Sequence, residues 1–409
     1  MSTDSAYTFN PHVEESAAPP IPLAARWASE FSPTPNEPLL NLAQGVPGDP
    51  PPQEFLDRLG KAASDPTTTG YGDLRGDLRL RQELARDIRR MYQEGEDEKS
   101  VSTDDVLADF QIVKAFYSSM IALCRSGDEV ILPTPWYFNH EMILRQLGVS
   151  LVPLPCQPPS FLPSVFLARS LVTSKTKAIV LVTPNNPTGA VYPKELLKEF
   201  ASLAEEMNLA LVLDETYREF VDGRPHDLFA ETEWRKYLIH LFSFSKSYAI
   251  PGHRLGALVA SRTFTGQLAK TLDCLQICPA RPAQKVLAEW AIQGTREWRA
   301  ETRRELERRQ KLFRESLEGV EGWQVETGSG YFAYVKHPFE GSSSEQVAKM
   351  LASKVGVIAL PGTFFSPPFK DVKEDRFIRF SIANVSTEVL QQVPPRLRKL
   401  NEIWSSLAH

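Results

Sequence analysis

Short, uninterrupted apolar runs recur through the middle of this chain, and amphipathic stretches separate them. The runs lie at residues 129–133, 178–182, 209–213, 238–243 and 257–260, and the stretch at 193–207 has the spacing of an amphipathic helix. Strands that are apolar on both faces are typical of a parallel sheet covered by helices on both sides. The pattern therefore predicts an α/β fold with a mostly parallel sheet covered by helices.

The pattern changes toward both ends of the chain. Residues 1–38 contain many prolines and predict an extended arm, whereas residues 75–93 have helical spacing. Residues 295–318 predict a long charged helix, and strands follow near 355–360 and 376–383. This organisation predicts an N-terminal arm at 1–29, a large domain at 60–295, and a smaller α+β domain built from 30–59 and 296–409.

Charge argues against nucleic acid or an anionic membrane as a partner. The net charge is −5 and the isoelectric point is about 5.9, so the surface as a whole is not basic. Within the arginine-rich helix, Glu301 precedes Arg304 by three residues and Glu305 precedes Arg309 by four. Pairs at this spacing are typical of a solvated helix face. We therefore expect neither partner.

Composition is that of an ordinary globular enzyme. Of the 409 residues, 42% are hydrophobic and 24% are charged, and this length favours two domains. The sequence has no apolar stretch of about 18 residues and no apolar run after Met1, so we expect a cytoplasmic protein without a membrane span. The four cysteines are too sparse for a disulfide framework and lack zinc-site spacing, so we expect free thiols and no metal.

Polar motifs follow the predicted strands in a fixed order. They are Thr183-Pro184-Asn185-Asn186-Pro187-Thr188-Gly189, Asp214-Glu215-Thr216-Tyr217, Ser243-Phe244-Ser245-Lys246 and Pro251-Gly252-His253-Arg254. Ligands of open α/β sheets collect at the carboxyl ends of the strands, where Asp214 falls. Together and in this order, the motifs resemble the class I/II aminotransferase family, whose fold is the type I fold of pyridoxal-phosphate enzymes.

The resemblance implies the cofactor pyridoxal 5′-phosphate and assigns residues around its ring. Lys246 matches the lysine that forms the Schiff base with the cofactor aldehyde. Asp214 matches the aspartate that pairs with the ring nitrogen and keeps it protonated, as an electron sink requires. Tyr217 and Asn186 match the groups that hydrogen-bond the phenolic oxygen. Tyr137 matches the aromatic side chain that stacks on the ring, with its neighbour Trp136 as the alternative.

The resemblance also assigns residues to the phosphate. Ser243 and Arg254 match the family's phosphate serine and arginine. Tyr71 matches the tyrosine that reaches the phosphate of a partner subunit, which implies a homodimer with shared active sites. One segment departs from the pattern, because 110–115 reads Phe-Gln-Ile-Val-Lys-Ala where the family usually has a Gly/Ser/Thr-rich turn. The backbone N–H groups of Ile112 and Val113 can still donate, since they do not depend on the side chain.

The substrate side of the site is assigned in the same way. Arg379 matches the arginine that grips the substrate carboxylate, an interaction that suits the two-pronged guanidinium group. Gly45 matches the glycine whose backbone lies against that carboxylate, and Asn186 lies near the substrate as well as the cofactor. The sequence offers no clear second arginine for a dicarboxylic substrate.

Three functions follow from these residues. The first is amino-group transfer between an amino acid and a 2-oxo acid through the Lys246 Schiff base, in amino acid metabolism. The second keeps the cofactor but performs β- or γ-elimination, replacement or cyclisation in a biosynthetic pathway, and the unusual 110–115 segment keeps this alternative open. The third is a DNA-binding regulator of the same fold, which the short, proline-rich N-terminal segment without a basic module disfavours.

Overall fold

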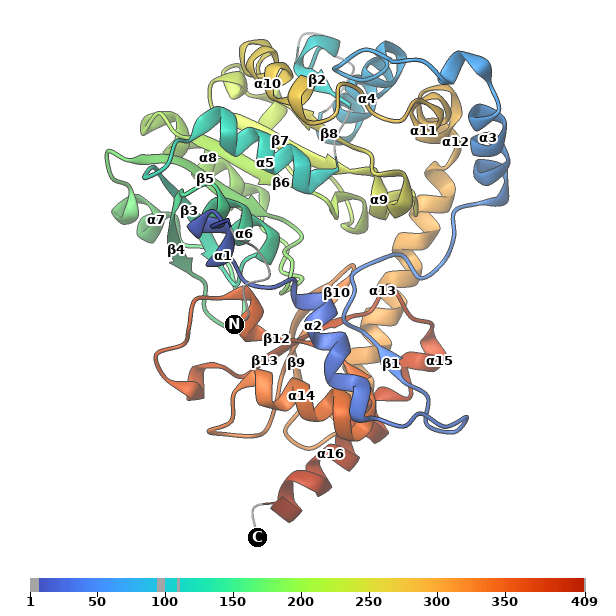
Figure 1. Cartoon of the computed structure of the whole chain (residues 1–409), viewed down its shortest axis with the longest axis vertical. Coiled ribbons are helices and arrows are strands. Elements are labelled where there is room, and N and C mark those ends of the chain that lie inside the picture. The colour runs from blue at the N-terminus through green and yellow to red at the C-terminus, as the bar shows by residue number, and fades with distance from the viewer. Residues whose placement is uncertain (1–6, 94–99, 109–110, 408–409) are drawn as a thin grey trace.

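Within the described residues the protein has a large and a small sheet, each packed against its own helices, and a third sheet of two short strands (Figure 1). The structure is a computed structural model that describes residues 7–93, 100–108 and 111–407. Across these residues, no helix combines the length and the apolar character that crossing a lipid bilayer would need. Residues 1–6 of the predicted arm lie outside the described residues.

The larger sheet carries the predicted apolar runs. Within the described residues it has seven strands in the order β2-β8-β7-β6-β5-β3-β4. Their bounds are Val106–Leu107 (β2), Glu129–Thr134 (β3), Ser150–Pro155 (β4), Thr176–Val182 (β5), Ala210–Asp214 (β6), Leu238–Ser243 (β7) and Gly256–Val259 (β8). Strands β3 to β7 run parallel, whereas β8 is antiparallel to both β7 and β2. The predicted mostly parallel sheet is therefore confirmed.

Alternate residues of each central strand enter two different cores. Ile179 and Leu211 pack in one core, and their neighbours Val180 and Val212 pack in the other. The first core includes residues of α3 (Gln53–Ala63), α4 (Leu78–Tyr92), α7 (Val165–Leu171), α8 (Lys194–Glu206) and α11 (Arg281–Val286). The second includes residues of α5 (Ile112–Leu123), α6 (Phe138–Gln146) and α10 (Arg262–Leu275). Both faces are buried, which explains why these strands lack a polar side.

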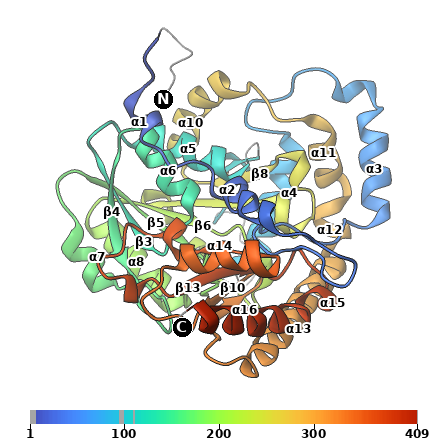
Figure 2. The same cartoon turned by 60° about the horizontal axis from the view of Figure 1, so that its bottom comes forward.

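The smaller sheet is antiparallel, with strand order β12-β13-β10-β9. Its strands are β9 (Gln324–Ser329), β10 (Phe332–Lys336), β12 (Leu360–Pro361) and β13 (Phe377–Ser381). Its core is shared with α13 (Arg296–Glu318), α14 (Ser344–Val355), α15 (Thr387–Leu390) and α16 (Val393–Leu407). Figure 2 shows α14 and α16 side by side against this sheet. Helix α13 extends from the region of the large sheet down to the small one.

The N-terminal segment packs against the C-terminal part of the chain. Strand β1 (Leu40–Asn41) pairs in parallel with β11 (Val357–Ile358). The expectation of a wholly extended arm is wrong for α1 (Pro11–Glu14) and α2 (Pro20–Trp27). Both helices begin with proline, whose fixed backbone angle suits the first turn of a helix. The predicted domain boundaries themselves stay predictions.

The solvated face predicted for α13 is only partly confirmed. Arg304 and Glu301 are about half exposed and form an ion pair of 2.7 Å. Arg309 forms the expected pair with Glu305 at 2.9 Å but is buried, where it also donates to the Val385 carbonyl at 3.0 Å and pairs with Asp49 at 3.2 Å. The same helix therefore presents arginines both to solvent and to the protein interior.

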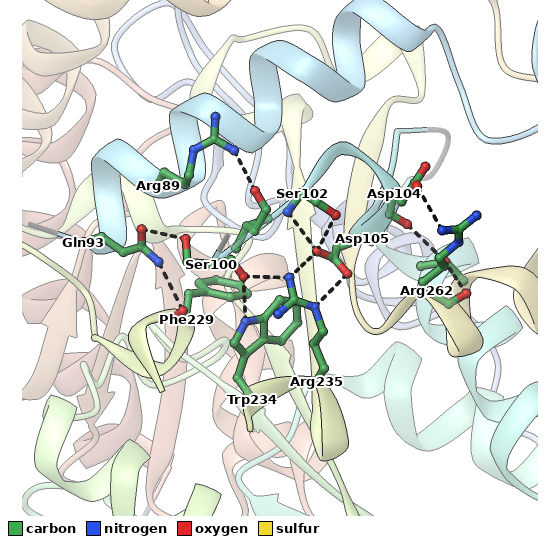
Figure 3. A network of polar contacts seen from close by, with 12 residues as sticks. Arg89, Gln93, Ser100, Ser102, Asp104, Asp105, Phe229, Trp234, Arg235 and Arg262 are labelled. Carbon is green, nitrogen blue, oxygen red and sulfur yellow. Dashed lines mark hydrogen bonds and ion pairs between the residues drawn. The ribbon is translucent and has the colours of Figure 1, made fainter. Parts of the chain in front are cut away.

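A polar network holds the edge of the large sheet to its centre (Figure 3). Arg235 Nε and Nη2 donate to the two oxygens of Asp105 at 3.0 and 2.6 Å, directly before β2. Arg235 and Trp234 both donate to the Ser100 carbonyl, at 2.9 and 2.8 Å. These bonds join residues 100–105 to the turn that leads into β7. They supplement the pairing of the edge strand β2 with β8, which involves only two residues of each strand.

Acid should destabilise the fold through His337. This histidine lies buried after β10, its Nε2 atom 3.3 Å from the Asp375 carbonyl oxygen, and burial together with the charge of Arg376 lowers the pKa of His337 to about 4. Because the pKa is lower in the folded state, the neutral ring stabilises the fold above about pH 6.5, and this stabilisation is lost as the pH falls toward 4. The loss amounts to at most about 1.4 kcal/mol per pH unit for one group.

The pH dependence of urea unfolding between pH 7 and 4 measures this effect. His337→Gln should show a shallower loss of stability than the wild type, and His12→Gln, which removes an exposed histidine, should not. Equal slopes for the wild type and His337→Gln would contradict the assignment.

Candidate active site

One cavity of about 170 Å³ brings together nearly all the residues singled out in the sequence. It lies where β5, β6 and β7 end, because Val182, Asp214 and Ser243 close those strands and all line it. Parallel strands end at the same edge of a sheet, so motifs that are far apart in sequence meet there. The predicted site residues that line it are Gly45, Ile112, Val113, Tyr137, Asn186, Asp214, Tyr217, Ser243, Lys246, Arg254 and Arg379.

Lys246 projects from a short helix directly after β7. This helix, α9 (Phe244–Ser247), is capped by Ser243, whose hydroxyl oxygen accepts from the Ser245 N–H at 3.2 Å. Burial, with the positive charges of Arg254 and Arg379, lowers the pKa of Lys246 to about 8. A larger fraction of the amine is therefore neutral near physiological pH than for a free lysine, which makes it a better nucleophile.

Asp214 is a buried carboxylate held from two sides. Its Oδ1 atom accepts from the Thr216 N–H at 3.0 Å and from the Thr216 hydroxyl at 2.8 Å. Its Oδ2 atom lies 3.3 Å from Nε2 of His140, a fully buried residue of α6 whose ring packs 4.1 Å from that of Phe116. The two hydrogen bonds orient the carboxylate through one oxygen, while the imidazole lies beside the other oxygen without a hydrogen bond among the described residues.

His140 is a residue that the sequence did not single out. It lies two residues after the start of α6, in no motif, and its proximity to Asp214 at the end of β6 arises only from the tertiary structure. Phe332 and Ile21 were also missed, and both line the cavity. Ile21 comes from α2, within the segment expected to be an extended arm.

Several donors suited to an anion line the cavity. Helix α5 begins at Ile112, so the N–H groups of Ile112 and Val113 lie in its first turn. Backbone N–H groups in the first turn have no acceptor within the helix, and the N-terminus is the positive end of the helix dipole. Arg254 is exposed, has a left-handed backbone angle of +54°, and donates from Nε to Gln111 at 3.1 Å. The segment 110–115 thus keeps a helix start at the cavity despite its unusual side chains, although Phe110 lies outside the described residues.

Arg379 occupies a different part of the cavity wall, on β13. It donates from Nη1 to Asn186 Oδ1 at 2.8 Å and from Nη2 to the Ala43 carbonyl, and burial lowers its pKa to about 10. Since Asn186 Oδ1 accepts from Arg379, the amide N–H₂ group of Asn186 is the part left to donate. The guanidinium carbon lies 4.5 Å from the Phe332 ring centroid.

Gly45 is required by close packing. A Cβ atom at this position would lie 2.5 Å from Cζ of Phe332, so any side chain would displace the ring that lies against Arg379.

The aromatic residues divide between the cavity and the core. Tyr217 and Tyr137 both line the cavity, and burial raises the pKa of both hydroxyls, so both are neutral donors. Trp136, the alternative to Tyr137, is buried in the hydrophobic core with residues of α5 and does not line the cavity. Tyr71 is 80% exposed and is the one predicted site residue that does not line the cavity of its own chain.

The chemistry of the donors fits pyridoxal phosphate. The cavity presents an amine of lowered pKa, a buried oriented carboxylate, and a separate group of N–H, hydroxyl and guanidinium donors. These match an aldehyde, a protonated ring nitrogen and a phosphate, respectively. Arg379 stands apart from this set and is suited to a carboxylate.

This chain is similar in sequence and in structure to aminotransferases. The family model "Aminotransferase class I and II" matches residues 37–397. The aromatic aminotransferase ISS1 of Arabidopsis thaliana is 30% identical over 369 residues, covering 88% of this chain and 89% of the relative. The aspartate aminotransferase of Sulfurisphaera tokodaii is 28% identical, covering 84% of this chain and 86% of its own. A solved mutant of Thermus thermophilus aspartate aminotransferase superposes with a TM-score of 0.85 at 25% identity, covering 96% and 99% of the two chains.

The lowered pKa of Lys246 can be measured in the cofactor-free protein. Acetylation of its amine by acetic anhydride, followed by peptide mass spectrometry, should reach half of its maximal rate near pH 8, against about 10.4 for a free lysine. Arg254→Gln removes a like charge and should shift the midpoint upward. A midpoint near that of free lysine in the wild type would contradict the effect of burial.

Proposed function

This chain belongs to the class I and II aminotransferase family, and we propose that the cavity around Lys246 is its active site. The protein is a pyridoxal-phosphate-dependent transferase that moves an amino group between an amino acid and a 2-oxo acid. Elimination, replacement or cyclisation is not favoured, because the relatives are aromatic and aspartate aminotransferases. The observation that carries the site assignment is the meeting of Lys246, Asp214 and Arg379 at one cavity.

Lys246 is the proposed catalytic residue. When bound, pyridoxal phosphate supplies an aldehyde that condenses with amines and a ring that accepts electrons from the substrate's α-carbon. Lys246 Nζ is the amine that holds the cofactor at rest, and it moves the proton from the substrate's α-carbon once the substrate amine has replaced it. Its pKa of about 8 suits both tasks, since the amine must be neutral to accept a proton.

The remaining polar residues hold the cofactor. Asp214 pairs with the ring nitrogen, and His140 positions Asp214 from behind. Tyr217 and Asn186 donate to the phenolic oxygen, and Tyr137 packs on the ring. The phosphate is bound by donors from three segments, namely Ser243, Arg254 and the N–H groups of Ile112 and Val113.

Arg379 binds the α-carboxylate of the substrate. The two charges compensate each other where the guanidinium is buried, and an unpaired charge there would cost several kcal/mol. Asn186, already bonded to Arg379, and the backbone at Gly45 complete the carboxylate site. Burial of this arginine therefore favours substrates that carry a carboxylate.

We propose that the preferred amino donors have apolar side chains, aromatic ones included. Among the described residues that line the cavity, the cations are Lys246, Arg254 and Arg379, and each has a role already. The uncharged part of the wall includes the apolar Ile21, Val46, Phe138 and Phe332, together with polar groups such as Gln44 and Gln111 that carry no charge to pair with a carboxylate. An apolar wall favours an apolar side chain, whereas a second carboxylate would be desolvated without a partner.

The protein is proposed to act as a homodimer. Tyr71 is highly exposed and does not line the cavity of its own chain, as expected for a side chain that completes the phosphate site of a second copy. The cytoplasmic location and the biosynthetic role stay predictions.

Rapid mixing of the purified holoenzyme with a single amino acid tests the function. Phenylalanine, without any 2-oxo acid, should convert the cofactor from its aldehyde form to its amine form, which absorbance reports, and release one phenylpyruvate per site. Aspartate should react with a kcat/KM at least about tenfold lower, since one desolvated charge without a partner costs more than about 1.4 kcal/mol. Lys246→Ala should lose nearly all of this conversion.

Two outcomes would contradict the proposal in different ways. Ammonia release without cofactor conversion would rule out amino-group transfer by this site. Faster reaction with aspartate than with phenylalanine would leave the transfer intact and overturn the substrate class.

Mixing two inactive variants tests the role of Tyr71 across the subunit interface. Tyr71→Ala should bind the cofactor weakly, and Lys246→Ala should be inactive. After co-refolding, a mixed dimer contains one site with both native residues only if Tyr71 acts in the partner. About half of the dimers in a random one-to-one mixture are mixed, and each has one intact site of two, so activity should return to about a quarter of wild type. No recovery would mean that Tyr71 acts within its own chain or not at all.

A further inference from the structure

A second cavity of about 420 Å³ is lined chiefly by arginines. Among the described residues, it shares no lining residue with the active-site cavity. Its arginines come from α4, from the turn Arg218–Phe220 that follows Tyr217, from the loop after it, and from the start of α13. They are Arg90, Arg218, Arg224, Arg296, Arg299 and Arg303. Three of them, at 296, 299 and 303, share one face of α13 because they are spaced by three and four residues.

Among the described residues, one buried carboxylate is shared by several of these guanidinium groups. Asp87, whose side chain is fully buried, lies 2.6 Å from Arg90, 3.6 Å from Arg218 and 3.9 Å from Arg296, so one carboxylate serves three guanidinium groups. Arg299 pairs with Glu219, which also lines the cavity. Arg303 pairs at 2.8 Å with Asp222 and at 3.6 Å with Glu307, which are 86% and 51% exposed, and pairs with such exposed partners contribute little in water. Burial and the like charge of Arg90 lower the pKa of Arg296.

Several guanidinium nitrogens of this cavity lack acceptors. The Arg218 side chain is fully buried. Its Nε, Nη1 and Nη2 atoms make no hydrogen bond within the described part of the chain. The Nε atoms of Arg296, Arg299 and Arg303 are likewise buried and without a hydrogen bond there. The Phe242 ring, 3.7 Å from the Arg218 guanidinium carbon, covers the flat face of the group but cannot accept from its edges. A buried donor without an acceptor costs about 1–3 kcal/mol or more when charged, so the site favours a ligand that supplies acceptors.

We propose that this arginine-lined cavity binds a small multivalent oxyanion, carrying either phosphate or carboxylate groups. Guanidinium groups bind such anions with paired, charge-assisted hydrogen bonds. Arg296 and Arg303, which are 38% and 23% exposed, form the accessible side, while Arg218 and Arg299 form the buried wall. Arg218 follows Tyr217 directly, so the proposed anion site and the active-site cavity are lined by residues that are adjacent in the chain.

Titration calorimetry on the holoenzyme tests this site, with sodium pyrophosphate and sodium citrate as separate probes and sodium chloride holding the ionic strength constant. At least one probe should bind saturably with one site per chain and raise the thermal unfolding midpoint. Binding by pyrophosphate alone would identify a phosphate site, and binding by citrate alone a carboxylate site. Absence of saturable binding by both probes would overturn the proposal.

Variants on α13 locate the binding. Arg296→Gln and Arg303→Gln should each weaken it by roughly tenfold or more, because each removes a charge-assisted hydrogen bond. Arg304→Gln is the matched control, since it removes the same charge from the same helix outside the cavity lining. Near-UV circular dichroism and basal transamination show whether each variant folds. If one variant does not fold, the other still tests the site. Binding that neither variant weakens more than Arg304→Gln does would come from an adventitious ion only, and would overturn the proposal.

Discussion

The parallel alignment of β5, β6 and β7 is the constraint from which the active site follows. Each strand is apolar on both faces and is buried between two layers of helices, so its side chains of Val, Leu and Ile contribute roughly 1.5–3 kcal/mol each when fully buried. That burial fixes the register of the strands and therefore the edge at which they end. Asp214 and Ser243 are the last residues of β6 and β7, and Lys246 lies in the helix that follows β7, so all three line the cavity at this edge.

Buried charge is managed differently in the two cavities. In the active site, Asp214 receives two hydrogen bonds from Thr216, and Arg379 donates to Asn186 and to a backbone carbonyl. These partners offset part of the cost of desolvation but leave charge facing the cavity, where a cofactor or substrate supplies the rest. In the arginine-lined cavity, Asp87 is shared by three guanidinium groups and Glu219 pairs with a fourth, so several guanidinium nitrogens there have no hydrogen-bond acceptor among the described residues.

The two sites are joined by short elements of the chain. The segment from Asp214 to Phe220 begins in the active-site cavity and ends at the arginine-lined one. Helix α13 contributes Arg296 to the second cavity and continues to the core of the small sheet through Phe313 and Leu317. A ligand that changes the position of either element would therefore act on the packing between the two sheets.

The sequence by itself determined the strands, the family and the side chains of the chemical groups, because hydrophobic period and motif order are local properties. The tertiary structure alone decided which of them meet. It assigned Tyr137 rather than Trp136 to the cavity, brought in His140 from a helix without a motif, and turned Arg303 from a presumed solvated face toward a cavity. Such contacts join residues that are distant along the chain, and they depend on how helices pack on the sheet, which local periodicity does not encode.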